Sequence, residues 1–231
     1  MTDLACVWII PCDVPPEIAA NCQSVLDDGE RARADAFETP RDRQQFIIAH
    51  GALRTLASRE LNTPAAALTW LPGQHGKPEL APPWSWLNTS LSHSASMIAV
   101  ATSTGRPVGV DIQHLSPGLD VTGLSARFFP PDEAAYVAAG DGASTRADRF
   151  AHLWARKEAV VKTAGGRLWP NLAISVLDRA VVSCAEPAGT CRVADVTVPK
   201  GFRAAVSMMG EAPFAVAVAG WPTEVEVSTM A

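Results

Sequence analysis

A short apolar segment that contains one carboxylate constrains the fold of this chain more than any other feature. Residues 107–113 read Pro-Val-Gly-Val-Asp-Ile-Gln, and their β-branched side chains favour a β-strand. Alternation along a strand places Gly109, Asp111 and Gln113 on one face and the apolar side chains on the other. An unpaired carboxylate in such a strand is costly, so Asp111 needs a hydrogen-bonding, cationic or metal partner. The alternative is that Asp111 caps a neighbouring loop where the strand ends.

A helix about forty residues further along the chain supplies two side chains of opposite charge. The apolar residues that recur at helical spacing are Phe150, Leu153, Trp154 and Val161. The helix is expected over 147–164, with an N-cap at Ser144 or Thr145 and an end at Gly165-Gly166. Glu158 and Lys162 lie at the margin of the apolar arc, where a carboxylate can be half-desolvated and still be reached. By itself, this helix favours the simpler interpretation of Glu158 and Lys162 as an ordinary i,i+4 pair that contributes roughly 0.2 to 0.5 kcal/mol.

Five segments of this chain occur together, in the same order, in one enzyme family. They are Gly76-Lys77-Pro78, Ser90-Leu91-Ser92-His93-Ser94, Gly109-Val110-Asp111-Ile112, Arg127-Phe128-Phe129 with Asp132-Glu133, and Trp154-Ala155-Arg156-Lys157-Glu158-Ala159-Val160-Val161-Lys162. Each segment alone occurs by chance in many proteins, but five in the correct order and approximate spacing are far more specific. The chain therefore resembles the Sfp-type 4'-phosphopantetheinyl transferases over most of its length.

The resemblance and the order of the elements both indicate an α+β fold. We expect two similar, pseudo-duplicated α/β subdomains related by a pseudo-twofold axis, with the active site in the cleft between them. The expected halves are 1–105, with the coenzyme A adenine and phosphate contacts, and 106–231, with the metal-binding and catalytic motifs and the carrier docking site.

The hydrophobic pattern predicts the individual elements. Strands are expected at 5–10, 90–94, 96–102, 107–113, 172–177, 190–198, 202–208 and 214–219, and helices at 17–26, 44–60, 121–127, 132–139 and 147–164. The strand pairs expected to form β-hairpins are 96–102 with 107–113, and 202–208 with 214–219.

The resemblance gives a role to each matching polar residue. It implies that Asp111 and Glu158 hold Mg2+, or Mn2+ in its place, and that Gln113 ligates the metal weakly or through a water. It also implies that Glu158 accepts the proton of the attacking hydroxyl, and that Lys162 faces the phosphates. The residues expected to contact coenzyme A are Arg33, Lys77, Pro78, Ser92, His93, Lys157 and Lys162. The reaction implied is transfer of 4'-phosphopantetheine from coenzyme A to a serine of an apo acyl or peptidyl carrier protein.

The carrier protein is expected to dock on apolar side chains near the cleft. The candidates are Leu119, Val121, Leu124 and Phe128. The alternative is that these residues form the core face of a short helix. The sequence does not distinguish fatty-acid, polyketide and non-ribosomal-peptide carriers.

Three positions depart from the family pattern. Gln113 stands where the family has an acidic residue, so the site would hold its metal with two carboxylates. Glu30 and Gln45 stand where basic phosphate contacts are usual, which leaves the 3'-phosphate of coenzyme A with fewer cations. The nearby arginines expected to compensate are Arg31, Arg41 and Arg43, because a guanidinium can bind phosphate bidentately.

Two other function classes stay open. One is a hydrolase in which Ser92 is the nucleophile and His93 the base. Against it, adjacent strand residues point apart and the chain has no Gly-x-Ser-x-Gly segment. The other is a non-catalytic module that binds coenzyme A or a carrier protein. The retained Asp111, Glu158 and Lys162 argue against that module.

Composition sets broad limits on the class of protein. A chain of 231 residues, 48% of them hydrophobic, can bury a sizeable core. The net charge of -5 argues against a general nucleic-acid binder. The five cysteines form no Cys-x-x-Cys pair, which predicts reduced thiols rather than a zinc site or a disulfide framework. No targeting segment or membrane span is expected, so we predict a cytoplasmic protein. Separately, we expect a monomer.

Overall fold

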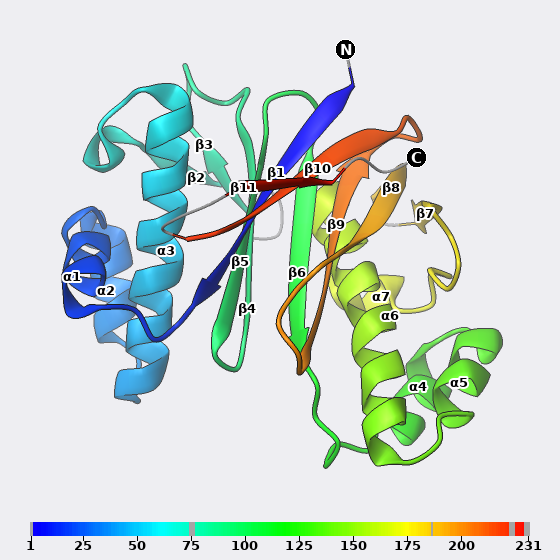
Figure 1. The fold of residues 1–231 in the computed structure, drawn as a ribbon. Coiled ribbons are helices and arrows are strands. Elements are labelled where there is room, and N and C mark those ends of the chain that lie inside the picture. The colour runs from blue at the N-terminus through cyan, green and yellow to red at the C-terminus, as the bar shows by residue number, and fades with distance from the viewer. Residues whose placement is uncertain (1, 74–76, 186, 222–224, 229–231) are drawn as a thin grey trace.

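Two neighbouring β-sheets carry helices on their outer sides (Figure 1). The computed structural model describes residues 2–73, 77–185, 187–221 and 225–228. In chain order the elements are β1 (Asp3–Pro11), α1 (Pro16–Ser24), α2 (Asp28–Asp35), α3 (Pro40–Leu61), the short helix η1 (Ala65–Ala67), β2 (Trp70–Pro72), β3 (Pro78–Leu80), β4 (Asn88–Ser94), β5 (Met97–Ser103), β6 (Val108–His114), α4 (Val121–Phe128), α5 (Pro131–Ala138), α6 (Ala143–Ala164), α7 (Leu168–Asn171), β7 (Val181–Ala185), β8 (Ala188–Val196), β9 (Phe202–Met209), β10 (Phe214–Gly220) and β11 (Val225–Ser228). The expected α+β class is confirmed, and the pseudo-twofold similarity of two halves stays a prediction.

The strand order joins the two ends of the chain. The first sheet has the order β11-β10-β1-β5-β4, and the second has the order β6-β9-β8-β7. β1 is parallel to β10 on one side and antiparallel to β5 on the other. The strands after residue 214 therefore complete the sheet that begins at the amino terminus.

The apolar face of β6 is buried between the sheets. The residues of β6 in this shared apolar layer are Val108, Val110 and Ile112. Asp111 lies on the opposite face, which α6 covers, as the alternation in the sequence predicts. At Gly109 a Cβ atom would lie 2.2 Å from the main-chain oxygen of Ala159, so glycine is required for α6 to approach β6 this closely.

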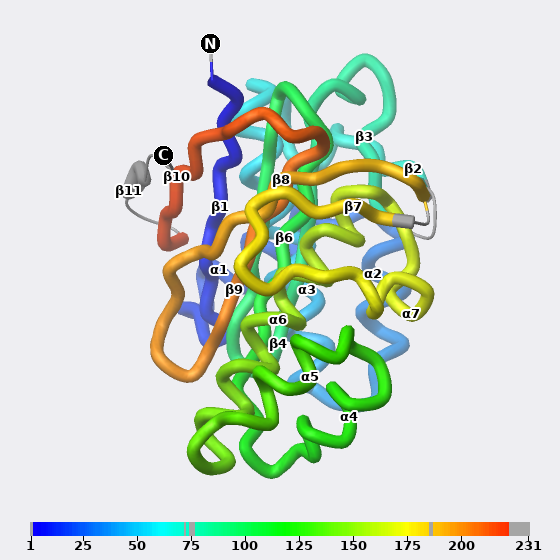
Figure 2. Tube along the Cα trace, turned by 90° about the vertical axis from the view of Figure 1, so that its right-hand side faces the viewer, coloured from blue at the N-terminus to red at the C-terminus, as the bar shows by residue number. Residues whose placement is uncertain are grey.

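β4 and β6 lie side by side although they belong to different sheets (Figure 1 and Figure 2). Serine side chains of β4 take the place of a main-chain ladder. The N–H of Val110 donates to Ser90 Oγ at 3.0 Å, and the N–H of His114 donates to Ser94 Oγ at 3.0 Å. The Ser92 hydroxyl donates to a side chain of β6 instead. This seam between the sheets is where the candidate site lies.

Both predicted hairpins are wrong, although their four strands exist. β5 pairs with β1 and β4, while β6 pairs with β9. β9 pairs with β6 and β8, while β10 pairs with β1. In each case the turn carries the chain from one sheet to the other. Arg106 links the two crossings by donating to the carbonyl oxygens of Met209 at 2.8 Å and Ala212 at 3.1 Å.

Three smaller expectations also need correction. No strand forms at 172–177, because the N–H groups of Val176 and Leu177 donate to the Glu133 carboxylate instead of to a ladder. α6 begins at Ala143 after Gly142, so Ser144 and Thr145 lie inside its first turn and do not cap it. α2 was not predicted, because it is largely polar; its signal is a capping box of Asp27 and Glu30. The remaining predicted strands and helices are confirmed within a few residues.

Two further features bear on the class of protein. None of the helices in the described ranges has an apolar stretch of membrane-spanning length. The thiols of all five cysteines are free.

Candidate active site

Asp111 is the central carboxylate of the seam, and only 4% of its surface is exposed. Its Oδ1 accepts a hydrogen bond from the Ser92 hydroxyl at 2.6 Å and lies 2.7 Å from Lys162 Nζ. Its Oδ2 is buried and has no hydrogen-bond partner among the described residues. Asp111 therefore has the partners that its apolar strand requires and does not cap a loop. One of its oxygens stays available to a further ligand.

Glu158 lies on α6, one helical turn before Lys162, and is half-buried as the sequence predicts. Burial raises the pKa of Glu158 to about 7; the Lys162 ammonium partly opposes this rise, and the charge of Asp111 adds to it. Two carboxylates thus lie close to one ammonium group. When both are ionised, the site carries a surplus negative charge.

This arrangement fits a hard divalent cation. Mg2+ prefers oxygen ligands and keeps several waters when a protein supplies few of them. The buried, unpartnered Oδ2 of Asp111 and the neighbouring Glu158 carboxylate are such ligands. Gln113 lies on the same strand face as Asp111 and is partly exposed, and its role as a metal ligand stays a prediction. No cluster of three or more His, Cys, Asp or Glu side chains suited to a metal occurs in the described ranges, so waters would complete the coordination.

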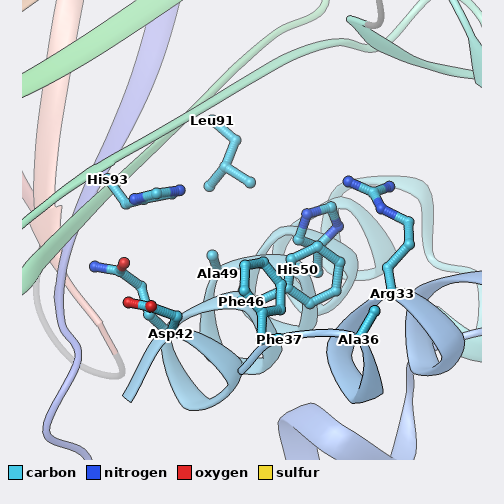
Figure 3. A pocket seen from close by; sticks show the side chains of 10 residues that line it. Arg33, Ala36, Phe37, Asp42, Phe46, Ala49, His50, Leu91 and His93 are labelled. Carbon is cyan, nitrogen blue, oxygen red and sulfur yellow. The ribbon is translucent and has the colours of Figure 1, made fainter. Parts of the chain in front are cut away.

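A cavity of about 530 Å³ lies between α2, α3 and β4 (Figure 3). Its lining residues are Arg33, Ala36, Phe37, Asp42, Gln45, Phe46, Ala49, His50, Leu91 and His93. Leu91 and His93 enter from β4, on the face opposite to the serines, as alternation predicts. Burial lowers the pKa of His93, as do the charges of Lys162 and His50, while Asp111 and Asp42 oppose this. His93 therefore lies in the wall of the cavity and within range of the charges of Asp111 and Lys162.

His50 is a candidate binding residue that the sequence reasoning missed. Its Nδ1 lies 3.1 Å from Glu30 Oε1, and its ring stacks on that of Phe46 with centroids 4.0 Å apart. The Arg33 guanidinium lies 5.0 Å from the centroid of the same Phe46 ring. Figure 3 shows the His50 ring beside the Arg33 guanidinium at one end of the cavity. The signal in the sequence was the spacing of Phe46 and His50, which places both on one face of a helix.

The two positions that lack the usual cation have structural roles. Glu30 is buried, and its carboxylate lies 2.5 Å from Arg54 Nε, on a guanidinium that is itself 0% exposed. Gln45 donates to the carbonyl oxygen of Ala95 at 3.0 Å and so holds the turn between β4 and β5. Ala95 adopts a positive φ of 52° in that turn. A cation at either position would therefore lose these contacts.

Of the arginines expected near the 3'-phosphate, Arg33 lines the cavity. Arg31 lies 3.5 Å from Asp28, and Arg43 lies 2.7 Å from Asp35. Arg41 is not among the residues that line the cavity. The expected compensation by Arg31, Arg41 or Arg43 is thus not what the structure shows.

Lys157 does not lie with Asp111 and Glu158. Its side chain is fully buried on another side of α6, with Nζ 2.5 Å from Glu133 Oε2 and 4.6 Å from the centroid of the Phe129 ring. The structure therefore does not bring Lys157 to the cavity of Arg33 and His93, and its contact with phosphate stays a prediction.

Lys77 and Pro78 line a second cavity of about 300 Å³, beside Thr163 and Gly165 at the end of α6. The Lys77 ammonium donates to the carbonyl oxygens of Val108 and Lys162. The structure therefore does not bring Lys77 or Pro78 to the cavity of Arg33 and His93. Gly76 of the same motif lies outside the described residues.

The four carrier docking candidates divide into two kinds. Val121 is 5% exposed and belongs to the core, and Leu124 and Phe128 are partly buried against it, so the core alternative holds for most of this set. Leu119 is 47% exposed. Trp169, which the sequence reasoning missed, is 69% exposed, and its ring centroid lies 5.3 Å from that of Phe128.

The hydrolase alternative has no geometric support. Ser92 donates its hydroxyl proton to Asp111, while His93 points into the cavity on the other face of β4. A serine nucleophile needs a base within reach of its hydroxyl. The neighbouring histidine does not supply it here.

Comparison with known proteins agrees with the geometry. Residues 107–204, which contain Asp111, Glu158 and Lys162, match the 4'-phosphopantetheinyl transferase superfamily. Slr0495 of Synechocystis sp., provisionally named a 4'-phosphopantetheinyl transferase, is 32% identical over 69% of this chain and 64% of its own length. The 4'-phosphopantetheinyl transferase HetI of Nostoc sp. is 29% identical over 71% of this chain and 70% of its own.

A third relative is the 4'-phosphopantetheinyl transferase Sfp of Bacillus subtilis, 25% identical over 62% of this chain and 61% of its own. The chain thus matches a little under two thirds of the length of the Synechocystis relative, at 64%. The resemblance inferred from the five segments is confirmed. Over residues 107–204 this chain matches the 4'-phosphopantetheinyl transferase superfamily, and the relatives that it resembles carry the same family name.

Proposed function

We propose that this chain transfers the 4'-phosphopantetheine group of coenzyme A to a serine hydroxyl of an apo carrier protein and releases adenosine 3',5'-bisphosphate. The observation that carries the proposal is the Asp111 carboxylate, with one oxygen paired to Lys162 and the other buried without a partner beside Glu158. The match to the superfamily supports the same reaction.

In this reaction the serine oxygen bonds to the β-phosphorus of coenzyme A, and the bond from that phosphorus to the bridging oxygen breaks. Glu158 accepts the serine proton; its pKa of about 7 in the metal-free protein suits a base that works near neutral pH. The Lys162 ammonium stabilises the negative charge that develops on the departing phosphate. Asp111 and Glu158, with Gln113 beside them, would hold Mg2+, which when bound neutralises charge on the pyrophosphate.

The cavity next to this site has the character of a nucleotide pocket. Phe46 and Phe37 supply apolar and aromatic surface, and their ring centroids lie 5.5 Å apart. Arg33 and His50 supply the cationic or hydrogen-bonding groups that a 3'-phosphate requires, and His93 lies at the end that we assign to the pyrophosphate. We place the adenosine 3',5'-bisphosphate part of coenzyme A here, with its pyrophosphate at the Asp111 side of His93.

The second substrate is an acyl or peptidyl carrier protein from a fatty-acid, polyketide or non-ribosomal-peptide synthase. We assign carrier docking to the exposed side chains of Leu119 and Trp169. The ring of partly buried Phe128 lies against that of Trp169 and supports it. We expect the chain to act as a monomer in the cytoplasm, where coenzyme A and apo-carriers meet.

The direct test is intact-mass spectrometry of apo-carrier proteins incubated with this chain, coenzyme A and Mg2+. We expect each active carrier to gain one phosphopantetheine group, with no gain after chelation of the metal. A chain that binds coenzyme A but modifies no carrier in a broad panel would instead be a non-catalytic binding module.

A further inference from the structure

Lys77 is a half-buried lysine whose ammonium binds main-chain oxygens. Its ammonium donates hydrogen bonds of 2.9 Å to the carbonyl oxygens of Val108 and of Lys162. No carboxylate of the described residues forms an ion pair with it. Burial lowers the pKa of Lys77 to about 8, and the charges of Glu79 and Cys191 oppose this effect. The two carbonyl groups are therefore the main partners that keep this ammonium in place.

These two carbonyl groups belong to the two elements that present the proposed reacting groups. Val108 is the first residue of β6, the strand that carries Asp111. Lys162 lies in the last turn of α6, and its own side chain reaches Asp111 at 2.7 Å. A cation at this end of a helix also interacts favourably with the helix dipole. One lysine side chain thus ties β6 to α6 directly behind the pair of Lys162 and Asp111.

The contact between β6 and α6 has little free space in which to shift. A Cβ at Gly109 would meet main-chain atoms of Ala159 and Thr163 at 2.2 and 2.5 Å. The Thr163 hydroxyl donates to the carbonyl oxygen of Ser207 at 3.0 Å and fixes the same turn to β9. Polar contacts of this kind set the height of α6 above the sheet, and the height decides whether Lys162 and Glu158 reach Asp111.

We propose that Lys77 is a positioning residue: its ammonium holds the last turn of α6 against the start of β6, so that Lys162 and Glu158 meet Asp111 in the geometry that transfer requires. This inference rests on the proposed function for its kinetic consequence. It assigns Lys77 no contact with the reacting phosphates.

The test is the variant Lys77→Ala, assayed for carrier modification with coenzyme A and Mg2+. We expect kcat to fall about 100-fold, because small displacements of positioned groups cost about that much. We expect KM for coenzyme A to stay within about threefold, because binding in the cavity of Arg33 and His93 is unchanged. The cavity of about 300 Å³ that Lys77 lines gives a small amine access to the vacated position. Propylammonium should therefore restore kcat, and propanol of similar size should not.

The control is Lys200→Ala, which removes an exposed lysine of the segment between β8 and β9. It should leave kcat and the position of Lys162 unchanged, and propylammonium should not raise its kcat. If Lys77→Ala does not fold, Lys77→Met keeps the length of the side chain without a donor and should show the same fall in kcat at unchanged KM.

A crystal structure of the Lys77 variant gives a result that does not depend on turnover. We expect Lys162 Nζ to move away from Asp111 Oδ1 by about 1 Å or more. A raised KM with unchanged kcat, equal rescue by propanol, or an unmoved Lys162 would overturn the positioning role. Absence of transfer by the wild-type chain would refute the proposed function, and the position of Lys162 would still decide the role of Lys77.

Discussion

Two lysines of α6 pair with carboxylates of neighbouring elements, and the two pairs differ in how deeply they are buried. The side chains of Lys157 and Glu133 are both 0% exposed and lie 2.5 Å apart. In the other pair, the Lys162 side chain is 28% exposed and its Nζ lies 2.7 Å from Asp111 Oδ1. The two lysines are separated by little more than one helical turn, yet they face different sides of the helix.

In the closed pair, Lys157 with Glu133, both charged groups have further protein partners. Glu133 Oε1 accepts the N–H groups of Val176 and Leu177, and Lys157 donates to the carbonyl oxygen of Ile174 and lies over the Phe129 ring. This pair therefore fastens α5 and the segment after α7 to α6.

In the open pair, Lys162 with Asp111, one oxygen of the carboxylate is left over. Asp111 Oδ2 is buried and unpartnered among the described residues, and burial raises the pKa of nearby Glu158 to about 7. A surplus of negative charge in a half-buried site favours a cation and a basic carboxylate. The same residue types thus stabilise the fold in one place and serve chemistry in the other.

The largest effect is expected from Glu158→Gln. Loss of the proton acceptor and of one metal ligand should lower kcat by about 10^3-fold or more, within the range for general-base residues. Circular dichroism and the melting temperature should show a folded protein, because the amide is close in size to the carboxylate. Carrier modification at more than about a tenth of the wild-type rate would show that Glu158 is not the base.

The pH dependence follows from the same residue. Glu158 must lose its proton to act as a base, so the rate should rise with pH through a value at or below about 7, since bound Mg2+ favours the ionised form. In the metal-free protein the raised pKa means that the folded state binds this proton more tightly than the unfolded chain. That contribution to stability is present at low pH and is lost as the pH rises towards about 7, which thermal unfolding of wild type and Glu158→Gln across pH would measure.

The second largest effect is a loss of stability, which should be larger for the closed pair than for the open pair. Lys157→Met leaves Glu133 buried without a cation and should lower the free energy of unfolding by about 3 to 5 kcal/mol. The control is the double variant Glu133→Gln/Lys157→Met, which removes both charges and should recover part of this loss. Urea unfolding gives the comparison; equal destabilisation by the single and double variants would contradict the account of the closed pair.

Lys162→Met should behave in the opposite way. Asp111 keeps the Ser92 hydroxyl as a partner and Lys162 is itself partly exposed, so the loss of stability should be smaller than for Lys157→Met, while kcat should fall because the developing phosphate charge loses its ammonium partner. An unaltered kcat with a large loss of stability would place Lys162 in the same class as Lys157.

A smaller effect is expected from Gln113→Glu, which adds a carboxylate to the open site. A third negative ligand should strengthen Mg2+ binding by about tenfold without changing the reaction, because charge count tunes affinity for hard cations. Titration of transfer rate against Mg2+ measures this change. An unchanged Mg2+ requirement would mean that residue 113 does not reach the ion.

Local patterns predicted the strand face of Asp111 and the helix position of Glu158 better than they predicted the pairing of the strands around them. Alternation along β6 and helical spacing along α6 placed Asp111 and Glu158 correctly, because both patterns depend on neighbouring residues. Strand partners were not predictable in this way: β5 and β6 are adjacent in sequence but cross between sheets. The direction of Lys157 depended on Glu133 of α5, and that contact is tertiary. His50 escaped notice because its meaning depends on a cavity that several elements form together.

The smallest effect concerns His50, which lines the cavity. Its Nδ1 contacts the Glu30 carboxylate, which also forms a buried ion pair with Arg54 of α3. If His50 contacts the 3'-phosphate, His50→Gln should remove about 1 kcal/mol of binding, or about fivefold in KM for coenzyme A. It should leave KM for 3'-dephospho-coenzyme A unchanged, so the ratio of the two KM values is the measurement. His93→Gln is the matched control at the other end of the cavity, where the pyrophosphate common to both substrates lies, and it should raise both KM values. Because Arg33 and His50 are the polar groups at the far end, the wild-type preference for the phosphorylated substrate should be modest, and a preference of a thousandfold would contradict this assignment.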